Sequence, residues 1–350
     1  TGSASSTWQS SATYTDTGLQ TNKCYGYKVQ ARDGLLNYGA TTTASTTYSG
    51  AATPGAPVAT PLATSSTFTN NANGNPSSNP TTNFAAQIVA TSPTDSTWLN
   101  KYIDSSGNPQ SAKQWLSDAQ LDSVTIQSLT PGTTYTIQVM ARNESLQETA
   151  SSTQTVFLTA PAAPGTPTYS NITDSSMTVS WSAATGATSY KLERCSGGGC
   201  SAVQIASGIA GTSYNDSGLT GNTTYYYRVR GSNAGGDGAY SATSSQLTLP
   251  SQSAPPTYTN VTTNSLRVNW SAPSGGAVSY KVERCQGDQC TNFSEIAAGV
   301  TTLYYDDSGL TPNVNYRYRI RATNATGDGV YSGITNTLLY NAPAGSVRFR

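Results

Sequence analysis

Leu219-Thr-Gly-Asn-Thr-Thr-Tyr225-Tyr-Tyr227-Arg-Val229-Arg is the stretch that predicts the fold, because the chain contains four versions of it. In each version a Leu precedes a Tyr by six positions, and apolar residues then alternate with polar ones. Alternation with a period of two indicates a β-strand with one buried face. The other versions are Leu19…Tyr25-Gly-Tyr27-Lys-Val29, Leu129…Tyr135-Thr-Ile137-Gln-Val139 and Leu310…Tyr316-Arg-Tyr318-Arg-Ile320.

The first Tyr of each version has a ring to bury and a hydroxyl that needs a partner. This pattern, Leu-x5-Tyr-x-φ-x-φ with Trp181 and Trp270 upstream in two versions, resembles the tyrosine corner and F strand of fibronectin type III domains. The resemblance implies an all-β fold of tandem immunoglobulin-like β-sandwiches, with Trp181 and Trp270 in the cores. It assigns structural tyrosine corners to Tyr25, Tyr135, Tyr225 and Tyr316.

Internal similarity is strongest in the second half of the chain. Trp181 matches Trp270 at a spacing of 89 residues, and Cys195 matches Cys285 at a spacing of 90. Such a period fits one sandwich per repeat, and the short proline-rich linkers predict a semi-rigid row of domains. We predict the C-terminal half of a domain at 1–50, a divergent domain at 51–160, complete domains at 161–250 and 251–340, and a linker or first strand of a further module at 341–350.

The region 51–160 departs from the repeat pattern. Asn70 stands at the aligned position of the core Trp, while Trp98 and Trp115 lie in an insertion at about 91–122. We therefore hypothesise that one of these two indoles refills the missing core volume. The segment 70–80 is rich in Asn, Ser and Pro, which predicts an exposed turn-rich tip.

The first fifty residues align only with the second half of a sandwich. Half a sandwich exposes an apolar sheet face and open strand edges. Two explanations are open: the natural chain continues beyond these ends, or another subunit completes the first module. The tail at 346–350 has the length of one strand and cannot replace three.

Composition narrows the function. Lys plus Arg and Asp plus Glu number 18 each, so the chain has no charge excess that would attract nucleic acid. The absence of His excludes Ser-His-Asp and Cys-His catalysis and imidazole metal sites. No run of eighteen apolar residues is present, so the sequence predicts no membrane-spanning helix. We expect no catalysis, no cofactor and no metal.

The cysteines predict two local disulfides. Cys195 and Cys200 enclose a Gly-rich gap of four residues, and Cys285 and Cys290 stand at the matching place in the next repeat. A tight hairpin there brings the two Cβ atoms within bridging distance. Disulfides favour an oxidising compartment, so we expect an extracellular or cell-surface location. The unpaired Cys24 has two interpretations, a partner in the missing half-domain or an intermolecular bridge along a fibre.

The remaining polar residues have structural interpretations. Asp216, Asp306 and Asp307 precede the tyrosine corner, and Asp237 and Asp328 lie between glycines, so we interpret them as turn residues. Glu193-Arg194 and Glu283-Arg284 are expected to form exposed cross-strand ion pairs. Tyr226 points outward as a surface residue or as a ring for sugars or partners. Asn-x-Ser/Thr acceptors stand at Asn143, Asn171, Asn215, Asn222, Asn260, Asn269, Asn292 and Asn324.

The resemblance implies a secreted or cell-surface protein of a prokaryote. We expect a non-catalytic structural role, either as a stiff spacer or as a filament subunit with an adhesive function. Its partners would be further copies of itself or continuing modules of the same chain, with surface glycans or proteins as further candidates. The alternative is the accessory region of a secreted polysaccharide-degrading enzyme, either spacer or carbohydrate-binding.

Overall fold

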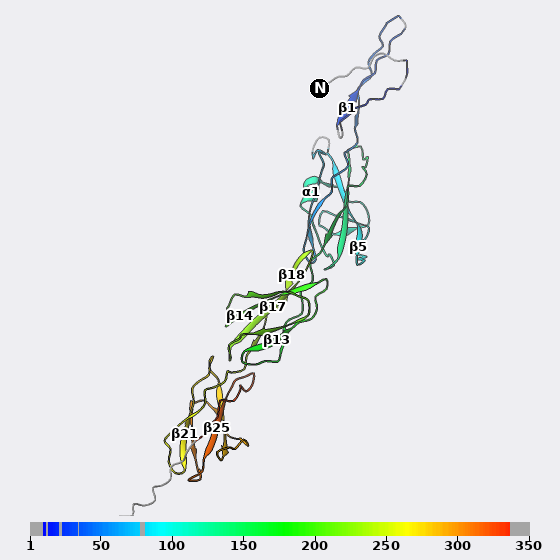
Figure 1. Cartoon of the computed structure of the whole chain (residues 1–350). Helices are drawn as coiled ribbons and strands as arrows, with labels where there is room; N and C mark the ends of the chain where they lie inside the picture. The colour runs from blue at the N-terminus through cyan, green and yellow to red at the C-terminus, as the bar shows by residue number, and fades with distance from the viewer. Residues whose placement is uncertain (1–9, 12, 21–22, 34, 78–80, 337–350) are drawn as a thin grey trace, which may run out of the picture. The chain divides into compact units, whose positions relative to one another are not determined.

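The computed structural model describes residues 10–11, 13–20, 23–33, 35–77 and 81–336, and the predicted segment 341–350 lies outside them (Figure 1). The chain divides into two compact units, Thr1–Ala162 with Asn233–Asp237 and Ala163–Ser232 with Gly238–Arg350. Within the described ranges the elements are antiparallel β-strands and one short helix, which confirms the predicted all-β class. In that part no helix has the length and hydropathy to cross a membrane.

The first unit begins with a two-stranded sheet. Strand β1 (Cys24–Tyr27) pairs with β2 (Ser45–Tyr48), with Cys24 opposite Tyr48. The alternation in β1 places Tyr25 and Tyr27 on its less exposed face. Apolar side chains around this hairpin stay in solvent, since Val29 is 66% exposed.

The region 51–160 folds into two sheets around one core. The smaller sheet has the strand order β3-β4-β9, and the larger has the order β11-β10-β5-β6-β7, with β8 beside β5. The elements are β3 (Val58–Pro61), β4 (Ser66–Thr69), β5 (Asn83–Ser92), β6 (Lys101–Ile103), β7 (Pro109–Gln110), β8 (Leu116–Ser117), α1 (Asp118–Asp122), β9 (Thr125–Ile126), β10 (Thr134–Arg142) and β11 (Thr155–Leu158).

The insertion in this region supplies the core indole. Trp98 is fully buried within the core cluster, and its Nε1 donates a hydrogen bond of 3.4 Å to the Ser128 carbonyl oxygen. Asn70, at the aligned Trp position, instead donates from its side chain to Asp118 at 2.8 Å. Helix α1, which carries Asp118, begins with a capping box between Ser117 and Gln120.

The second unit contains two sandwiches with matching topology. In the first, sheet β12-β13-β16 faces sheet β15-β14-β17-β18, with β19 beside β17. Apolar side chains of the two sheets share one core around Trp181. The strands are β12 (Thr168–Ser170), β13 (Ser176–Ser180), β14 (Ser189–Ser196), β15 (Val203–Ile209), β16 (Ser213–Ser217), β17 (Thr224–Asn233), β18 (Gly236–Tyr240) and β19 (Ser244–Leu247).

The second sandwich repeats this arrangement around Trp270. Sheet β20-β21-β24 faces sheet β23-β22-β25-β26, and their apolar side chains form a separate core cluster. The strands are β20 (Thr257–Thr259), β21 (Ser265–Asn269), β22 (Ser279–Gln286), β23 (Ser294–Val300), β24 (Tyr304–Ser308), β25 (Tyr316–Thr323) and β26 (Thr335–Asn336).

The tyrosine corner occurs in all four modules with the same geometry. A backbone N–H five residues upstream donates to each phenol oxygen, so the ring holds the chain where it enters the strand. In the two sandwiches of the second unit, Gly218 and Gly309 precede this corner with φ near +72° and +73°, a conformation that favours glycine. The bonds are Gln20 N to Tyr25 at 2.8 Å, Thr130 N to Tyr135 at 2.8 Å, Thr220 N to Tyr225 at 2.8 Å and Thr311 N to Tyr316 at 3.0 Å.

Candidate functional site

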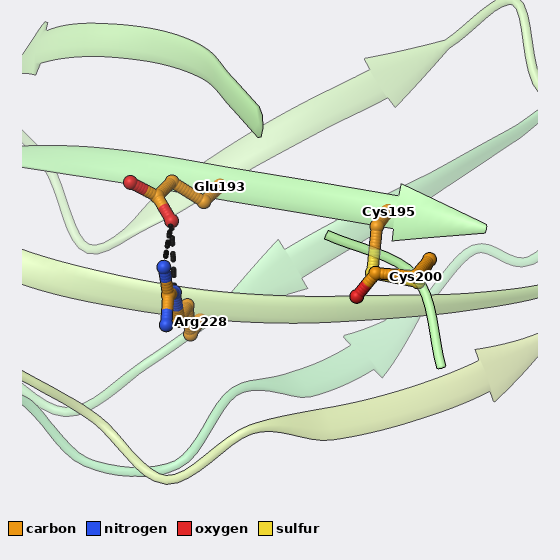
Figure 2. Close-up of a disulfide and its surroundings, with 4 residues drawn as sticks. All are labelled: Glu193, Cys195, Cys200 and Arg228. Atoms are coloured by element: carbon orange, nitrogen blue, oxygen red, sulfur yellow. Dashed lines mark hydrogen bonds and ion pairs between the residues drawn. A yellow bond between two sulfur atoms is a disulfide. The ribbon is translucent and has the colours of Figure 1, made fainter. Parts of the chain in front are cut away.

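The outward side of β14 and β17 carries a cluster of Glu193, Arg228 and Tyr240 beside a disulfide. Figure 2 shows Glu193, Arg228 and the disulfide. Glu193 on β14 lies opposite Arg228 on β17, because the antiparallel register pairs these two positions. The Arg228 guanidinium donates to the Glu193 carboxylate at 2.8 Å through Nε and lies 2.6 Å from it through a second nitrogen. Tyr240 also donates to Glu193, and Arg228 stacks on its ring at 4.1 Å.

Both glutamates form the expected cross-strand ion pairs, Glu193 with Arg228 and Glu283 with Arg319, but the expectation that these carboxylates are exposed is wrong. Glu193 is 8% exposed, and the matching Glu283 is 5% exposed. Burial by itself raises the pKa of Glu193, but hydrogen bonds from Tyr240 and Arg228 outweigh it and lower that pKa below the ordinary glutamate value. The strand alternation indicated the outward side, yet it could not show that neighbouring aromatic rings cover the carboxylate.

Arg194 and Arg284 pair with carboxylates of the facing sheet, and not with a neighbouring strand of their own sheet. Arg194 donates through Nη1 to both oxygens of Asp216 at 2.7 and 2.9 Å, and Arg284 donates to Asp307 at 2.9 Å. Asp216 and Asp307 are 4% and 5% exposed, so the interpretation of both as simple turn residues is wrong. They lie within β16 and β24 and bind side chains of the facing sheet.

The other carboxylates lie at different places. Asp306 lies within β24, so its interpretation as a turn residue is also wrong. It is exposed and pairs with Arg267 at 2.6 Å. Asp328, interpreted above as a turn residue, instead lies just after the turn, in a β-bridge opposite Thr323. There it receives Lys281 and Arg321, each at 3.0 Å. Across the part of the chain that the structure describes, no group of three or more His, Cys, Asp or Glu side chains has a geometry that could hold a metal ion.

The two predicted disulfides are present at the ends of β14 and β22. Cys195 and Cys200 are 5.8 Å apart between Cα atoms, and Cys285 and Cys290 are 5.9 Å apart. Cys195 follows Glu193 by two positions on β14, and Figure 2 shows the bridge toward the end of that strand. Cys24 is exposed and carries no disulfide.

A surface hollow of about 400 Å³ lies beside the first disulfide. Its wall includes the half-buried Tyr226 together with Arg228, which belongs to the cluster described above. In the following repeat Arg317 replaces Tyr226 and donates to the Cys290 carbonyl oxygen at 2.7 Å. The sequence singled out Tyr226, but it gave no sign that a hollow adjoins the ring.

The insertion in 51–160 places its two indoles differently. Trp98 fills the core, whereas Trp115 is half-buried at the surface. The Arg142 guanidinium lies 4.5 Å from the centre of the Trp115 ring. The hypothesis that one indole refills the core therefore applies to Trp98.

The predicted glycosylation acceptors differ in accessibility. Asn143 and Asn324 are 1% and 7% exposed, which excludes glycan attachment to the folded chain at these two positions. Asn222 and Asn269 are half-buried. The exposed acceptors are Asn171, Asn215, Asn260 and Asn292.

Comparison with known proteins agrees with the fold described above. The family model of the fibronectin type III domain matches residues 162–246 and 253–337. Endoglucanase B of Cellulomonas fimi is 29% identical over 241 residues, which cover 61% of this chain and 22% of that protein. Chitinase A1 of Niallia circulans is 28% identical over 211 residues, which cover 53% of this chain and 28% of that protein. The chain therefore matches less than a third of the length of either relative.

A solved structure of two fibronectin type III domains from chicken tenascin is also similar. It is 20% identical, has a TM-score of 0.35, and covers 50% of this chain and 99% of the solved segment.

Proposed function

Since residues 162–246 and 253–337 are tandem fibronectin type III domains, we propose that this chain is a non-catalytic accessory region of a secreted polysaccharide-degrading protein. Its role there is that of a stiff spacer between other modules. The relatives named endoglucanase and chitinase support this class of protein over a fibre subunit. The two disulfides support an extracellular location.

The observation that carries the spacer role is the junction inside the second compact unit. The buried Asn324 side chain donates to the Thr248 carbonyl oxygen at 2.8 Å and to Asn222 Oδ1 at 2.9 Å. Asn222 in turn donates to the Gly275 carbonyl oxygen at 2.9 Å. Asn324 of the second sandwich thus bonds a backbone carbonyl of the first, and Asn222 of the first sandwich bonds a backbone carbonyl of the second.

Glycines make this junction close-fitting. A Cβ atom added at Gly275 would lie 2.0 Å from the Gly221 carbonyl oxygen, and one added at Gly329 would lie 2.4 Å from the Pro250 carbonyl oxygen. Contacts this short are impossible for real side chains, so the two backbones meet where only hydrogen fits. A junction with such close backbone contact and directional hydrogen bonds resists bending more than a free linker does.

The carboxylates of these sandwiches support a non-catalytic role. Asp216 and Asp307 are each bound by an arginine and a tyrosine, and Glu193 is held in the same way. Glycoside hydrolysis needs two carboxyl groups placed on either side of a substrate bond. Carboxylates committed to internal ion pairs are not available to a substrate.

Rotational motion of the full chain tests the spacer. In ¹⁵N relaxation measurements on the oxidised protein, the sandwiches of the second unit should share one rotational correlation time. The double variant Asn324→Ala, Gly329→Ala should give each sandwich a shorter, separate time, while Asn292→Ala, which changes an exposed asparagine, should not. Separate correlation times in the unsubstituted chain would refute the stiff spacer.

A second measurement separates the spacer from the filament expected on sequence grounds. Electron microscopy of the native material should show dispersed particles if the chain is an accessory region. Regular filaments would favour the fibre subunit instead.

A further inference from the structure

The hollow beside the Cys195–Cys200 loop is the feature of the second unit that neither the sheet packing nor the spacer role uses. It measures about 400 Å³. Its wall includes Tyr226, the Arg228 guanidinium, the hydroxyl side chains of Ser201 and Thr243, and the Cys195–Cys200 disulfide. Gly199, Ala202 and Tyr227 also border it. The corresponding region of the second repeat shows which side chains can occupy this hollow.

A one-residue difference in loop length separates the two repeats. Arg194 pairs with Val203 across the disulfide hairpin, and Arg284 pairs with Ser294. The first pair encloses eight residues and the second encloses nine, because three residues follow Cys290 before the strand and only two follow Cys200. The longer segment of the second repeat ends with an aromatic residue, Phe293, directly before Ser294, where the first repeat has Ala202 before Val203.

Phe293 packs on the arginine that corresponds to Arg228. The Arg319 guanidinium lies 4.4 Å from the centre of the Phe293 ring and 3.7 Å from that of Tyr331. Arg228 stacks on Tyr240 at 4.1 Å and borders the hollow. The Arg228 side chain is 37% exposed against 25% for Arg319, so the missing ring leaves guanidinium surface uncovered.

The second difference between the repeats, Arg317 in place of Tyr226, also leaves the first repeat more open. Arg317 bonds to the Cys290 carbonyl oxygen and thereby ties the strand to the disulfide loop. Tyr226 stands at this position in the first repeat and lines the hollow. The first repeat therefore lacks both of the side chains, a phenylalanine and a tethered arginine, that occupy this region in the second.

We propose that this hollow is a binding subsite for a single pyranose unit of a polysaccharide. A pyranose has one apolar face, which suits the Tyr226 ring, and a rim of hydroxyls, which suits Arg228, Ser201 and Thr243. A phenyl ring of a protein partner would leave those polar groups unpaired, at a cost in binding free energy. The choice of a saccharide as the ligand rests on the proposed function, whereas the open hollow beside Tyr226 follows from the comparison of the two repeats alone.

A subsite of this size binds weakly. One ring stack and a few hydrogen bonds at an open surface correspond to a dissociation constant of about 1 mM. The subsite would therefore add contact along a polymer chain that other modules bind, and would not capture a short sugar by itself.

Titration of the ¹⁵N-labelled full chain with cellohexaose and chitohexaose tests the proposal, with both disulfides intact. At least one sugar should shift the amide signals of Tyr226, Arg228 and Thr243 and leave those of Arg317 and Arg319 in place. Tyr226→Ala should weaken binding by about tenfold or more, in line with the loss of one stacking contact. Arg317→Ala, the matched change in the second repeat, should leave it unchanged.

A variant that gains sugar binding tests the proposal more strictly than one that loses it. Deleting Phe293 and introducing Arg317→Tyr should open the second repeat, so that sugar now shifts the signals around Arg319. Unchanged thermal unfolding and intact disulfides establish that each variant is folded.

Two results would overturn the subsite. One is the absence of any sugar-induced shift up to about 10 mM, well above the expected dissociation constant. The other is binding of N-acetyl-phenylalanine amide without binding of either sugar, which would assign the hollow to a protein side chain. Neither result alters the correlation times that test the spacer, so failure of the two proposals can be told apart.

Discussion

The phenol of Tyr227 donates a hydrogen bond of 2.7 Å to the carboxylate of Asp216, and this bond joins the two sheets of the sandwich. Asp216 lies on β16 of one sheet, while Tyr227 and Arg194 lie on β17 and β14 of the other. The next repeat contains the same arrangement, with Tyr318 donating to Asp307 at 2.7 Å. A buried carboxylate with two partners therefore links the sheets in both domains.

Loss of this charge should destabilise the sandwich. Asp216→Asn leaves the Arg194 guanidinium, 27% exposed, without its counterion and weakens the bond from Tyr227. Breaking a buried pair by removing one partner costs about 3 kcal/mol. Urea unfolding followed at signals of this domain should report that loss. Asp306→Asn is the control, because its pair with Arg267 is exposed and contributes about 0.5 kcal/mol; equal losses in the two variants would contradict the prediction.

Alkaline pH should weaken the domain at 51–160 through Tyr135. Burial and the hydrogen bond to Asp95 raise the pKa of Tyr135 from 10.0 to about 12. Between these values the folded state holds a proton that the unfolded state has lost, so stability falls as pH rises. The contribution is complete below pH 10.0 and disappears toward about pH 12.

Unfolding free energies measured across that pH range check this sign. Tyr135→Phe should lower the overall stability and flatten the slope, because the variant has no phenol to titrate. A Phe variant with the same slope as the unsubstituted chain would remove Tyr135 as the cause.

The insertion should be essential for the core of 51–160. Trp98 is fully buried, so Trp98→Ala should destabilise this domain by about 3–5 kcal/mol through lost burial and the cavity left behind. Trp115→Ala removes a half-buried indole on the same insertion and should cost about 1 kcal/mol. Calorimetry of the two variants compares them directly, and a larger loss for Trp115→Ala would reverse our assignment of the core indole.

The disulfides should stabilise their domains modestly. Each bridge closes a loop with a sequence separation of 5 residues, and loop closure of that length is worth about 2 kcal/mol. The double variant Cys195→Ser, Cys200→Ser should therefore remain folded, with a thermal unfolding transition lowered by several degrees. Circular dichroism on heating measures this, and complete unfolding at room temperature would show that the bridge holds more than its own hairpin.

Much of the fold could be predicted because its determinants are local. The alternation after Tyr225 and Tyr316 requires only neighbouring residues on one strand, and it identified the buried face of β17 and β25. The positions of Cys195 and Cys200 within one hairpin likewise involve a short segment. Local spacing therefore predicted the all-β class and the repeat.

The partners of the charged residues could not be predicted in the same way. Sequence placed Glu193 and Arg194 next to each other on a strand, yet they bind Arg228 and Asp216 on different elements. The partner of each side chain depends on which strand lies beside β14 and on which strand of the other sheet faces it. Period-two alternation along one strand contains neither piece of information.

By itself, the sequence determined the strands, the tyrosine corners and the repeat length, because each follows from side-chain spacing along a short segment. Only the tertiary structure decided that Trp98 replaces the indole missing at Asn70, and that Phe293 covers in one repeat what stays open beside Tyr226 in the other. Those outcomes depend on packing between segments that are distant in sequence or that differ by one residue in length. Close packing admits one arrangement of these side chains, and their order along the chain does not specify it.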